Sequence, residues 1–238
     1  MANLLIDIGN TALKASWADG MTLGKTFRYQ GERMLDFILS LTAKEKPEKI
    51  ILSSVRYFSE QNVERLRKEC AKMIILDSEM LEQKYSIPSY LTPDRVAAIV
   101  ASRYLFKGKS CTIFDFGATL TIDNIDSAGK YLGGNISLGC RTRFKALNRY
   151  SKNLPLVDFD ENVNKFGNSL KSSLQSGVIS GMLFEIEGYL ADTSENIIVF
   201  TGGDANYFAK RMKNCIFAVC NLVLIGLALI AFEYDKKD

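Results

Sequence analysis

The chain has 238 residues, a length that accommodates two domains of about 110 residues each. Its 30 basic and 27 acidic residues nearly cancel, and no block of like charge is long enough to suggest a nucleic-acid-binding arm. The sequence contains no histidine, which excludes His-based triads, His-ligated zinc and imidazole acid–base chemistry. Any proton transfer must therefore use a carboxylate, Lys, Tyr or Cys.

The first half of the chain predicts alternating strands and helices. Residues 3–8 and 12–18 have the pattern of a hairpin with small residues between its strands, and residues 49–55 and 74–77 predict short buried strands. Helical spacing covers residues 34–45, 60–73 and 94–106. Pro93 and Asp94 stand at the start of the third helix, as first-turn chemistry prefers.

The pattern then restarts near residues 107–111, and we predict two domains, 1–109 and 110–238. Residues 110–117 and 119–126 predict a second hairpin, followed by a Gly-rich return over 127–139. Helices are predicted over 141–150 and 172–192, a strand over 196–205 and a further helix from 205. No low-complexity linker separates the halves, so we expect them to pack around a cleft.

An apolar segment, Ile216 to Phe232, contains 17 residues without a charge. That length is the lower limit of a membrane span, and Asn221 lies inside it. A buried strand that leads into a buried C-terminal helix explains the same pattern, and we favour this interpretation. It predicts that Asn221 lies at an end of the helix or has a polar partner.

The cysteines and the N-terminus indicate where the protein works. Cys70, Cys111, Cys140, Cys215 and Cys220 form an odd set without a CxxC spacing, so we expect reduced thiols, mostly buried in the core. The first residues lack the features of a signal peptide. We therefore expect a cytoplasmic protein.

Two similar turns follow the first strand of each half. Asp7 is followed by Gly9, Asn10 and Thr11, and Asp115 is followed by Gly117 and two small residues. Backbone N–H groups in such turns can approach a phosphate closely, and the aspartate can hold the accompanying metal ion. Val199 to Ala205 ("VFTGGDA") supplies a third small-residue loop. Each motif alone is weak, but the ordered set resembles the duplicated ribonuclease H-like α/β fold of actin, sugar kinases and the Hsp70 ATPase domain, whose two similar domains surround a nucleotide cleft.

Within that group the motifs resemble those of type III pantothenate kinases over essentially the whole chain. The matching segments are "DIGNTALK", "YSIPSYLTPDRVAA", "DFGATLTID", "GGNISLG", "GNSLKSSLQSG" and "TGGDA", in that order. The resemblance implies phosphorylation of pantothenate by ATP, the first step toward coenzyme A. It also implies a homodimer, potassium or ammonium as a monovalent cation, magnesium with the nucleotide, and no nucleic-acid or membrane partner.

The resemblance carries over to individual residues. Asp94 matches the catalytic base, and Asp115 the residue near the monovalent cation. The ATP contacts match Asp7, Ile8, Gly9, Asn10, Thr11, Ala12, Leu13, Lys14, Ala118, Thr119, Gly202 and Gly203. The substrate contacts match Tyr85, Thr92, Pro93, Asp94, Arg95 and Leu170. The planar fork of Arg95 also suits the carboxylate of pantothenate.

Four positions depart from the family pattern. Thr92 replaces a glycine, Ala118 a threonine, Leu138 a proline and Leu170 the substrate-contacting threonine. These changes leave two alternatives open besides a pantothenate kinase. One is a non-catalytic relative that binds nucleotide as a regulatory or interaction protein, and the other is a kinase of another small hydroxylated acid. The retained Asp7, Asp94 and Asp115 favour phosphoryl transfer.

Overall fold

In the computed structural model the chain divides into two units, one of Met1–Lys107 with Asn221–Asp238 and the other of Gly108–Cys220. The structure describes residues 2–191, 193, 195–213 and 216–235. The predicted boundary between residues 109 and 110 lies close to this division. Residues 221–235, which the prediction placed in the second domain, group with the first unit.

The first unit is built on five strands: β1 (Asn3–Ile8), β2 (Leu13–Asp19), β3 (Thr22–Tyr29), β4 (Lys49–Ser54) and β5 (Lys72–Ile75). They form one sheet in the order β3-β2-β1-β4-β5, in which β1 is antiparallel to β2 and parallel to β4. The central strand β1 is buried along its whole length, as its continuous apolar sequence predicts. Strand β3 was not predicted, because most of its side chains are polar and half-buried or exposed.

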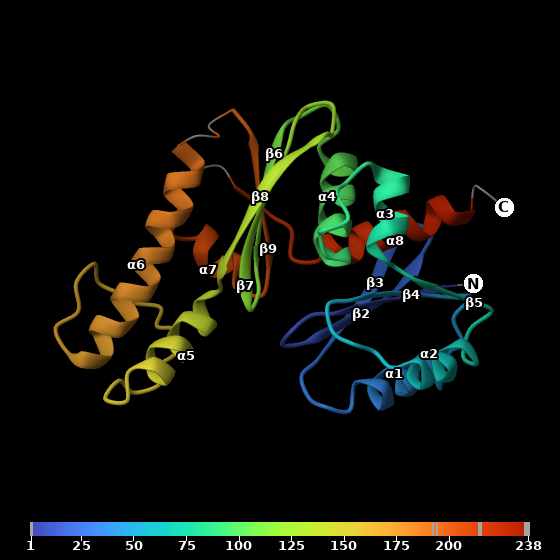
Figure 1. The fold of residues 1–238 in the computed structure, drawn as a ribbon, viewed down its shortest axis with the longest axis horizontal. Helices are drawn as coiled ribbons and strands as arrows, with labels where there is room; N and C mark the ends of the chain where they lie inside the picture. Colours follow the sequence, from blue (N-terminus) through green and yellow to red (C-terminus); the bar gives the residue numbers. More distant parts are fainter. Residues whose placement is uncertain (1, 192, 194, 214–215, 236–238) are drawn as a thin grey trace. The chain divides into compact units, whose positions relative to one another are not determined.

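Five helices belong to the same unit: α1 (Met34–Thr42), α2 (Glu60–Arg67), α3 (Ser78–Tyr85), α4 (Pro93–Leu105) and α8 (Leu222–Asp235). Helices α1 and α2 cover one face of the sheet, and α4 and α8 lie on the other (Figure 1). The core under α1 and α2 joins Leu4, Ile6 and Ile8 to Ile38 and Leu66. Helix α2 is shorter than predicted because the chain turns after Arg67 to enter β5.

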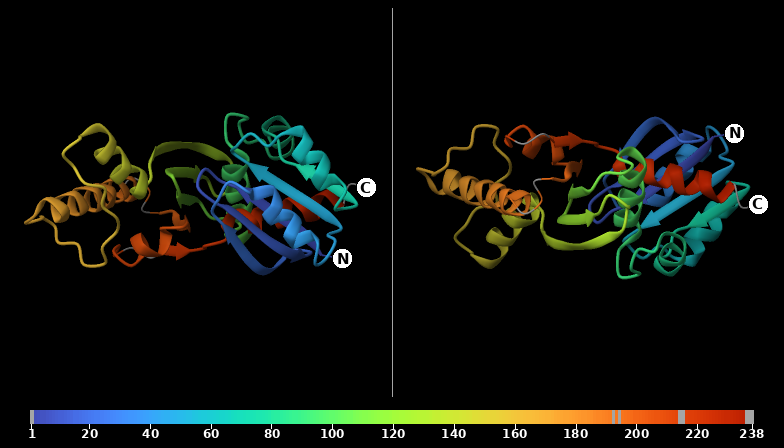
Figure 2. Two further views of the ribbon diagram at one scale, coloured as in Figure 1. Left: turned by 90° about the horizontal axis from the view of Figure 1, so that it is seen from below. Right: turned by 90° about the horizontal axis from the view of Figure 1, so that it is seen from above.

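The apolar segment near the C-terminus folds as a short strand over Ile216–Ala218 followed by α8. The buried helix agrees with the interpretation favoured from the sequence, whereas the strand is half-buried or exposed and not buried as predicted. Helix α8 lies beside α4 in every view (Figure 1, Figure 2). The two backbones approach so closely that a Cβ on Gly226 would lie 1.9 Å from the carbonyl oxygen of Ala97. Asn221 precedes α8 and donates a hydrogen bond to Thr26 Oγ1 at 3.2 Å, which confirms its predicted polar partner. No helix among the described residues is both long and apolar enough to cross a membrane.

The second unit repeats the strand order of the first. Its strands are β6 (Cys111–Phe116), β7 (Thr119–Ile125), β8 (Tyr131–Leu138), β9 (Ile197–Gly202) and β10 (Ile216–Ala218). They form a sheet in the order β10-β9-β6-β7-β8, so that β6, β7 and β9 occupy the places that β1, β2 and β4 hold in the first sheet. The internal duplication expected from the sequence is therefore confirmed. The segment 127–139, predicted as a Gly-rich return of the chain, largely forms the edge strand β8.

Helices α5 (Cys140–Tyr150), α6 (Leu170–Ala191) and α7 (Ala205–Ala209) pack on one face of this second sheet. The core beneath them is aromatic: Phe116 stacks on Phe208 with ring centroids 5.1 Å apart, and Phe114 meets Phe200 edge to face at 5.2 Å. This rigid cluster fixes the end of β6, and therefore the turn that follows it.

The cysteines agree in part with the prediction. Cys70, Cys111, Cys140 and Cys220 are free thiols, and Cys215 lies outside the described residues. Burial raises the pKa of Cys111 to about 11 and that of Cys140 to about 12, so both thiols stay protonated core side chains. Cys220 is exposed, unlike the core position expected of most of the set.

Candidate functional site

The first phosphate turn is the hairpin end between β1 and β2. The N–H of Gly9 donates to the carbonyl oxygen of Ala12 at 3.0 Å, and Asn10 and Thr11 are exposed at the tip. The side chains of Ile8 and Leu13 lie in the core, so of the predicted contact residues these two can offer a ligand only their backbone. The turn therefore presents N–H groups and short polar side chains to solvent.

Asp7 stands directly behind this turn and is buried, with 8% of its surface exposed. It is opposite Lys14 on β2 and Ser53 on β4, and the Ser53 hydroxyl donates to Asp7 Oδ1 at 3.2 Å. Opposite residues in a sheet project to the same face, so carboxylate, hydroxyl and ammonium groups share one side of the strand ends.

Arg56 is a candidate residue that the sequence reading missed. Its guanidinium donates to the carbonyl oxygen of Asn10 at the tip of the turn. The Arg56 backbone is held in a tight turn by Ser54. The Ser54 Oγ donates to the Arg56 carbonyl oxygen at 2.8 Å and accepts from the Arg56 N–H at 3.2 Å. The available signal was its place just after β4, since parallel strands β1 and β4 end at the same edge of the sheet.

The start of α4 carries the predicted substrate residues. Thr92 is the N-cap and Pro93 the first helical residue, as predicted, although the Thr92 side chain makes no capping hydrogen bond. Asp94 is partly exposed and its Oδ1 accepts from the N–H of Arg95 at 2.9 Å. Arg95 is buried, with 6% of its surface exposed, so its guanidinium is held within the protein and only a part can face a ligand.

Tyr85 ends α3, the helix that was not predicted. Its hydroxyl donates to Glu233 Oε2 of α8 at 2.7 Å, and its carbonyl oxygen accepts from Arg103 of α4 at 3.0 Å. Burial, followed by the hydrogen bond to Glu233, raises the pKa of the Tyr85 phenol far above its usual value. The phenol therefore stays neutral.

The second phosphate turn, between β6 and β7, matches the first in position but is shorter. The N–H of Gly117 donates to the carbonyl oxygen of Thr119 at 3.0 Å. The Ala118 carbonyl accepts from the N–H of Gly139 at 3.0 Å and from Thr142 Oγ1 at 2.6 Å. A Cβ on Gly139 would lie 2.1 Å from the Gly117 carbonyl oxygen, so "GGNISLG" needs its last glycine to reach this turn.

Asp115 stands behind the second turn as Asp7 stands behind the first. Asp115 is paired with Thr121 on the antiparallel strand β7 and with Thr201 on the parallel strand β9. In the first sheet, Lys14 and Ser53 occupy the corresponding positions beside Asp7. Each aspartate therefore has a hydroxyl residue on its parallel neighbour strand. This equivalence places two carboxylates and two small-residue turns at corresponding points of the repeat.

The loop after β9 wraps the end of β6. Gly202 has φ of +93°, and a Cβ there would lie 2.4 Å from Asp115 Oδ1 and 2.6 Å from the Phe116 carbonyl oxygen. The N–H of Asp204 points at the same carbonyl oxygen, 3.4 Å away. Gly202 and Gly203 thus lie beside Asp115, and the second unit gathers these predicted residues in one place.

We expect Gly202→Ala to weaken ATP binding by about 1–2 kcal/mol, because it strains a left-handed residue and pushes against the Asp115 carboxylate. Gly188→Ala in α6 is the control, since its Cβ would meet no atom within 4 Å and Gly188 is not among the predicted ATP contacts. Equilibrium titration with an ATP analogue measures the affinity of each variant. Equal affinity of the two variants would show that Gly202 does not shape a nucleotide site.

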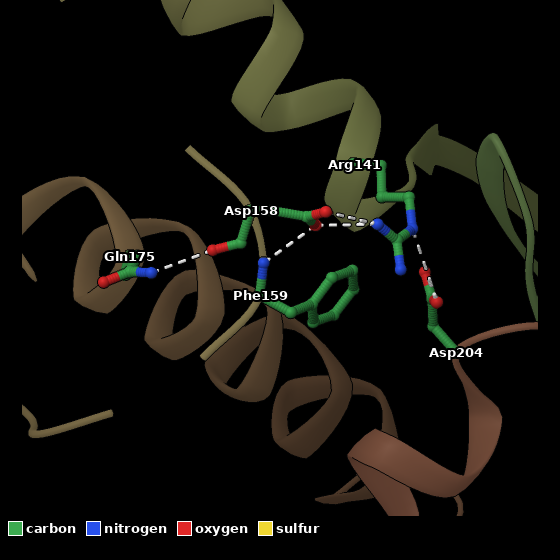
Figure 3. A network of polar contacts seen from close by, with 5 residues as sticks. All are labelled: Arg141, Asp158, Phe159, Gln175 and Asp204. Atoms are coloured by element: carbon green, nitrogen blue, oxygen red, sulfur yellow. Dashed lines mark hydrogen bonds and ion pairs between the residues drawn. The ribbon is translucent and has the colours of Figure 1, made fainter. Parts of the chain in front are cut away.

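Figure 3 shows a polar network next to this loop that was not predicted. Arg141 Nη1 donates to both carboxylate oxygens of Asp158 at 2.7 and 2.8 Å, and its Nε lies 3.9 Å from Asp204 Oδ1. The guanidinium also packs on the ring of Phe159, 4.6 Å from its centroid. Gln175 of α6 donates to the Asp158 carbonyl at 2.9 Å. Arg141 and Asp158 are more than half exposed, so the network orients the "TGGDA" loop and adds little stability.

Leu170, the last predicted substrate residue, lies at the start of α6. Its preceding residue Ser169 caps the helix: Ser169 Oγ accepts from the Ser172 N–H at 3.2 Å, and Ser172 Oγ accepts from the Ser169 N–H at 2.9 Å. The Leu170 side chain is 55% exposed and lines a 510 Å³ groove with Leu147 and Leu174. Leu170 therefore gives this groove an apolar wall at the position where the family resemblance predicts a threonine.

The duplicated sheet, with a small-residue turn after the first strand of each half, defines the fold class: the α/β fold shared by actin-like proteins and sugar kinases. Solved structures support this class. A conserved protein assigned to the Baf family of transcriptional activators from Campylobacter jejuni matches with a TM-score of 0.66 and 24% identity, covering 98% of this chain and 99% of that chain. The activator of 2-hydroxyisocaproyl-CoA dehydratase from Clostridium difficile, with bound ADPNP, has a TM-score of 0.60 and 15% identity, covering 100% and 96%. A ROK hexokinase from Thermus thermophilus has a TM-score of 0.54 and 13% identity, covering 100% of both chains.

The sequence comparisons narrow the class. The family model described as type III pantothenate kinase matches residues 3–192. A relative from Phocaeicola vulgatus of that name is 36% identical over 241 residues, covering 98% of this chain and 99% of the relative. The chain belongs to the type III pantothenate kinase family. It is therefore a kinase, a transferase that uses ATP, and the comparisons do not favour the non-catalytic alternative.

Proposed function

We propose that this protein transfers the γ-phosphoryl group of ATP to the primary hydroxyl of pantothenate, the first step of coenzyme A biosynthesis. The observation that carries the proposal is the register equivalence of the two turns, in which Asp7 and Asp115 stand at matching points behind Gly9 and Gly117. Phosphoryl transfer needs little covalent chemistry from the protein, and most of its catalysis is positioning and charge neutralisation. Two turns that present backbone N–H groups would supply both the positioning and the charge neutralisation.

In this proposal each of the two turns contributes backbone N–H groups to the binding of the ATP polyphosphate. Asn10 and Thr11 add donors at the first turn, and Arg56 adds a positive charge there. Gly202 and Gly203 offer an open backbone beside the second turn, against which the adenine ring can lie. The assignment of each residue to ATP is a proposal from the family pattern.

Asp94 acts as the base in this scheme. Its carboxylate accepts the hydroxyl proton of pantothenate late in the transfer. Its place in the first turn of α4 keeps the side chain partly exposed on a rigid helix. Arg95 directs its guanidinium toward the carboxylate of pantothenate, and burial of that side chain would strengthen the interaction.

We further propose a monovalent cation, potassium or ammonium, at Asp115, and magnesium on the nucleotide phosphates. Oxygen ligands suit these cations, and Asp115 has threonine residues opposite it on both neighbouring strands. The part of the chain that the structure describes has no cluster of three or more acidic, cysteine or histidine residues that would hold a metal alone. The ligand set therefore suits a cation that one carboxylate and neutral oxygens share.

A homodimer is also a proposal. The second unit exposes large apolar side chains on its edge strand β8, where Leu132 and Ile136 are 61% and 62% exposed, and on α6, where Phe184 is 57% exposed. Exposed apolar surface of this kind marks interaction sites in many proteins. In an isologous dimer the same surface of both subunits would be buried. The cytoplasmic location stays a prediction.

A coupled assay of ADP formation tests the proposed function. ATP turnover should require pantothenate and should be faster in potassium than in sodium at equal ionic strength. Leu170 and Thr92 raise a second candidate, another small hydroxylated acid, because Leu170 lacks the hydroxyl that the family uses. A panel of such acids should give lower kcat/KM than pantothenate. Turnover with another acid and none with pantothenate would establish the second candidate instead.

Ala118→Thr should lower the Michaelis constant for ATP several-fold, since one neutral hydrogen bond contributes about 0.5–1.5 kcal/mol. The threonine hydroxyl restores a donor that the family places at this turn. Ala118→Val is the matched control, because valine adds the same bulk without the hydroxyl. If both variants change the constant equally, the effect is steric and the hydroxyl has no role.

A further inference from the structure

The last helix reaches a residue that the family pattern places in the substrate site. Tyr85 and Glu233 are 148 positions apart, yet the Tyr85 hydroxyl lies 2.7 Å from Glu233 Oε2. The Tyr85 backbone is also fixed. Ser86 ends α3 in the left-handed conformation, with φ of 53°, and its N–H donates to the carbonyl oxygen of Glu82 at 2.9 Å. Arg103 donates to the carbonyl oxygen of Tyr85 at 3.0 Å.

The hydrogen bond determines what the phenol can offer a ligand. A phenol has one proton to donate, and in Tyr85 that proton is committed to the Glu233 carboxylate. Since the pKa of Tyr85 is raised by burial and by this bond, the proton remains on the phenol in neutral solution. The oxygen therefore faces its remaining surroundings with lone pairs, as an acceptor only.

Glu233 is itself held in place. Lys84 Nζ lies 3.4 Å from Glu233 Oε2, and the same ammonium lies over the ring of Tyr234 at 4.3 Å. The Tyr234 hydroxyl contacts the Met80 sulfur, which ties α8 to α3. The close approach of Gly226 to Ala97 fixes the rest of α8 against α4. The carboxylate is thus positioned by packing that lies outside the predicted site.

We propose that Glu233 is a positioning residue that presents Tyr85 to the substrate as a hydrogen-bond acceptor. Its partner would be a hydroxyl or amide N–H of pantothenate, both of which are donors. This inference rests on the proposed function, in which Tyr85 contacts pantothenate. It makes the C-terminal helix a part of substrate recognition, although no residue of α8 belongs to the family motifs.

Glu233→Gln and Tyr85→Phe test this role, since both are nearly isosteric. Each should raise the Michaelis constant for pantothenate about 3- to 10-fold, with kcat and the constant for ATP within about two-fold of the wild type. The double variant should be no worse than Tyr85→Phe alone, because both changes act on one interaction. Glutamine at position 233 is a weaker, neutral acceptor whose amide can also donate to the phenol oxygen, and phenylalanine at position 85 has no hydroxyl. Glu79→Gln is the matched control. It removes an exposed carboxylate from the first turn of α3, keeps the bond between Tyr85 and Glu233, and should leave the pantothenate constant unchanged.

An unchanged pantothenate constant in Glu233→Gln, or additive effects in the double variant, would overturn the inference while the wild type remains an active pantothenate kinase. A wild-type protein without pantothenate-dependent turnover would instead overturn the proposed function and the inference with it. Circular dichroism verifies folding. If Glu233→Gln does not fold, Glu233→Asp, which keeps the charge near Lys84 but shortens the reach to Tyr85, should show the same rise, and an unchanged constant there would also count against the role.

Discussion

Replacing Asp94 by asparagine should lower the rate of pantothenate phosphorylation about 10²–10⁴-fold and leave the first unit folded. The variant removes the base that accepts the hydroxyl proton. An asparagine Oδ1 can still accept from the Arg95 N–H, so the start of α4 keeps its local hydrogen bond. The loss of a negative charge near the helix N-terminus should destabilise the unit by only about 0.3–1 kcal/mol.

Asp36→Asn is the matched control for this experiment. Asp36 is also an acid in the first turn of a helix of the first unit, and it is half exposed and paired with Arg33. It should lose similar stability and no activity. Trp17 in β2, the single tryptophan of the chain, reports the folding of this unit by fluorescence. Wild-type turnover in purified Asp94→Asn would refute the assignment of the base.

Gly226→Ala should destabilise the first unit by about 3 kcal/mol, at the upper end of what one added methyl group does in a packed core. A Cβ at this position would lie 1.9 Å from the Ala97 carbonyl oxygen and 2.8 Å from its Cα, both backbone atoms that cannot move alone. Helices α4 and α8 would have to separate along their length. The higher helix propensity of alanine, about 1 kcal/mol, offsets only part of this cost.

Gly188→Ala in α6 is the control, because a Cβ there meets no atom within 4 Å. It should stabilise the second unit by about 0.5–1 kcal/mol. Urea titrations followed by Trp17 fluorescence should show a lower unfolding midpoint for Gly226→Ala than for the wild type. The midpoint of Gly188→Ala should not be lowered. A Gly226→Ala variant as stable as the wild type would contradict the close packing of α4 on α8.

The sequence alone predicted most of the elements that carry the candidate site. Strand β1 is continuous and apolar, α4 starts with Pro93 and Asp94, and a glycine follows the aspartate of each repeat, so local patterns were sufficient. Strand β3 and helix α3 were missed for a local reason, and the segment that forms β8 was predicted only as a Gly-rich return. The residues of β3 alternate only weakly between buried and exposed, and those of α3 have little apolar character, so neither has a clear periodicity.

The placement of α8 could not be predicted from sequence, because Leu222–Asp235 is apolar on nearly all sides and indicates burial without naming a partner. Only tertiary packing decided that it belongs with α4, where Gly226 permits the backbones to touch. The same packing brings Glu233 to Tyr85 across 148 positions and Arg56 to the turn at Asn10. The turns and the three aspartates are determined by residues within a few positions of each other, whereas these contacts depend on long-range packing that no short pattern encodes.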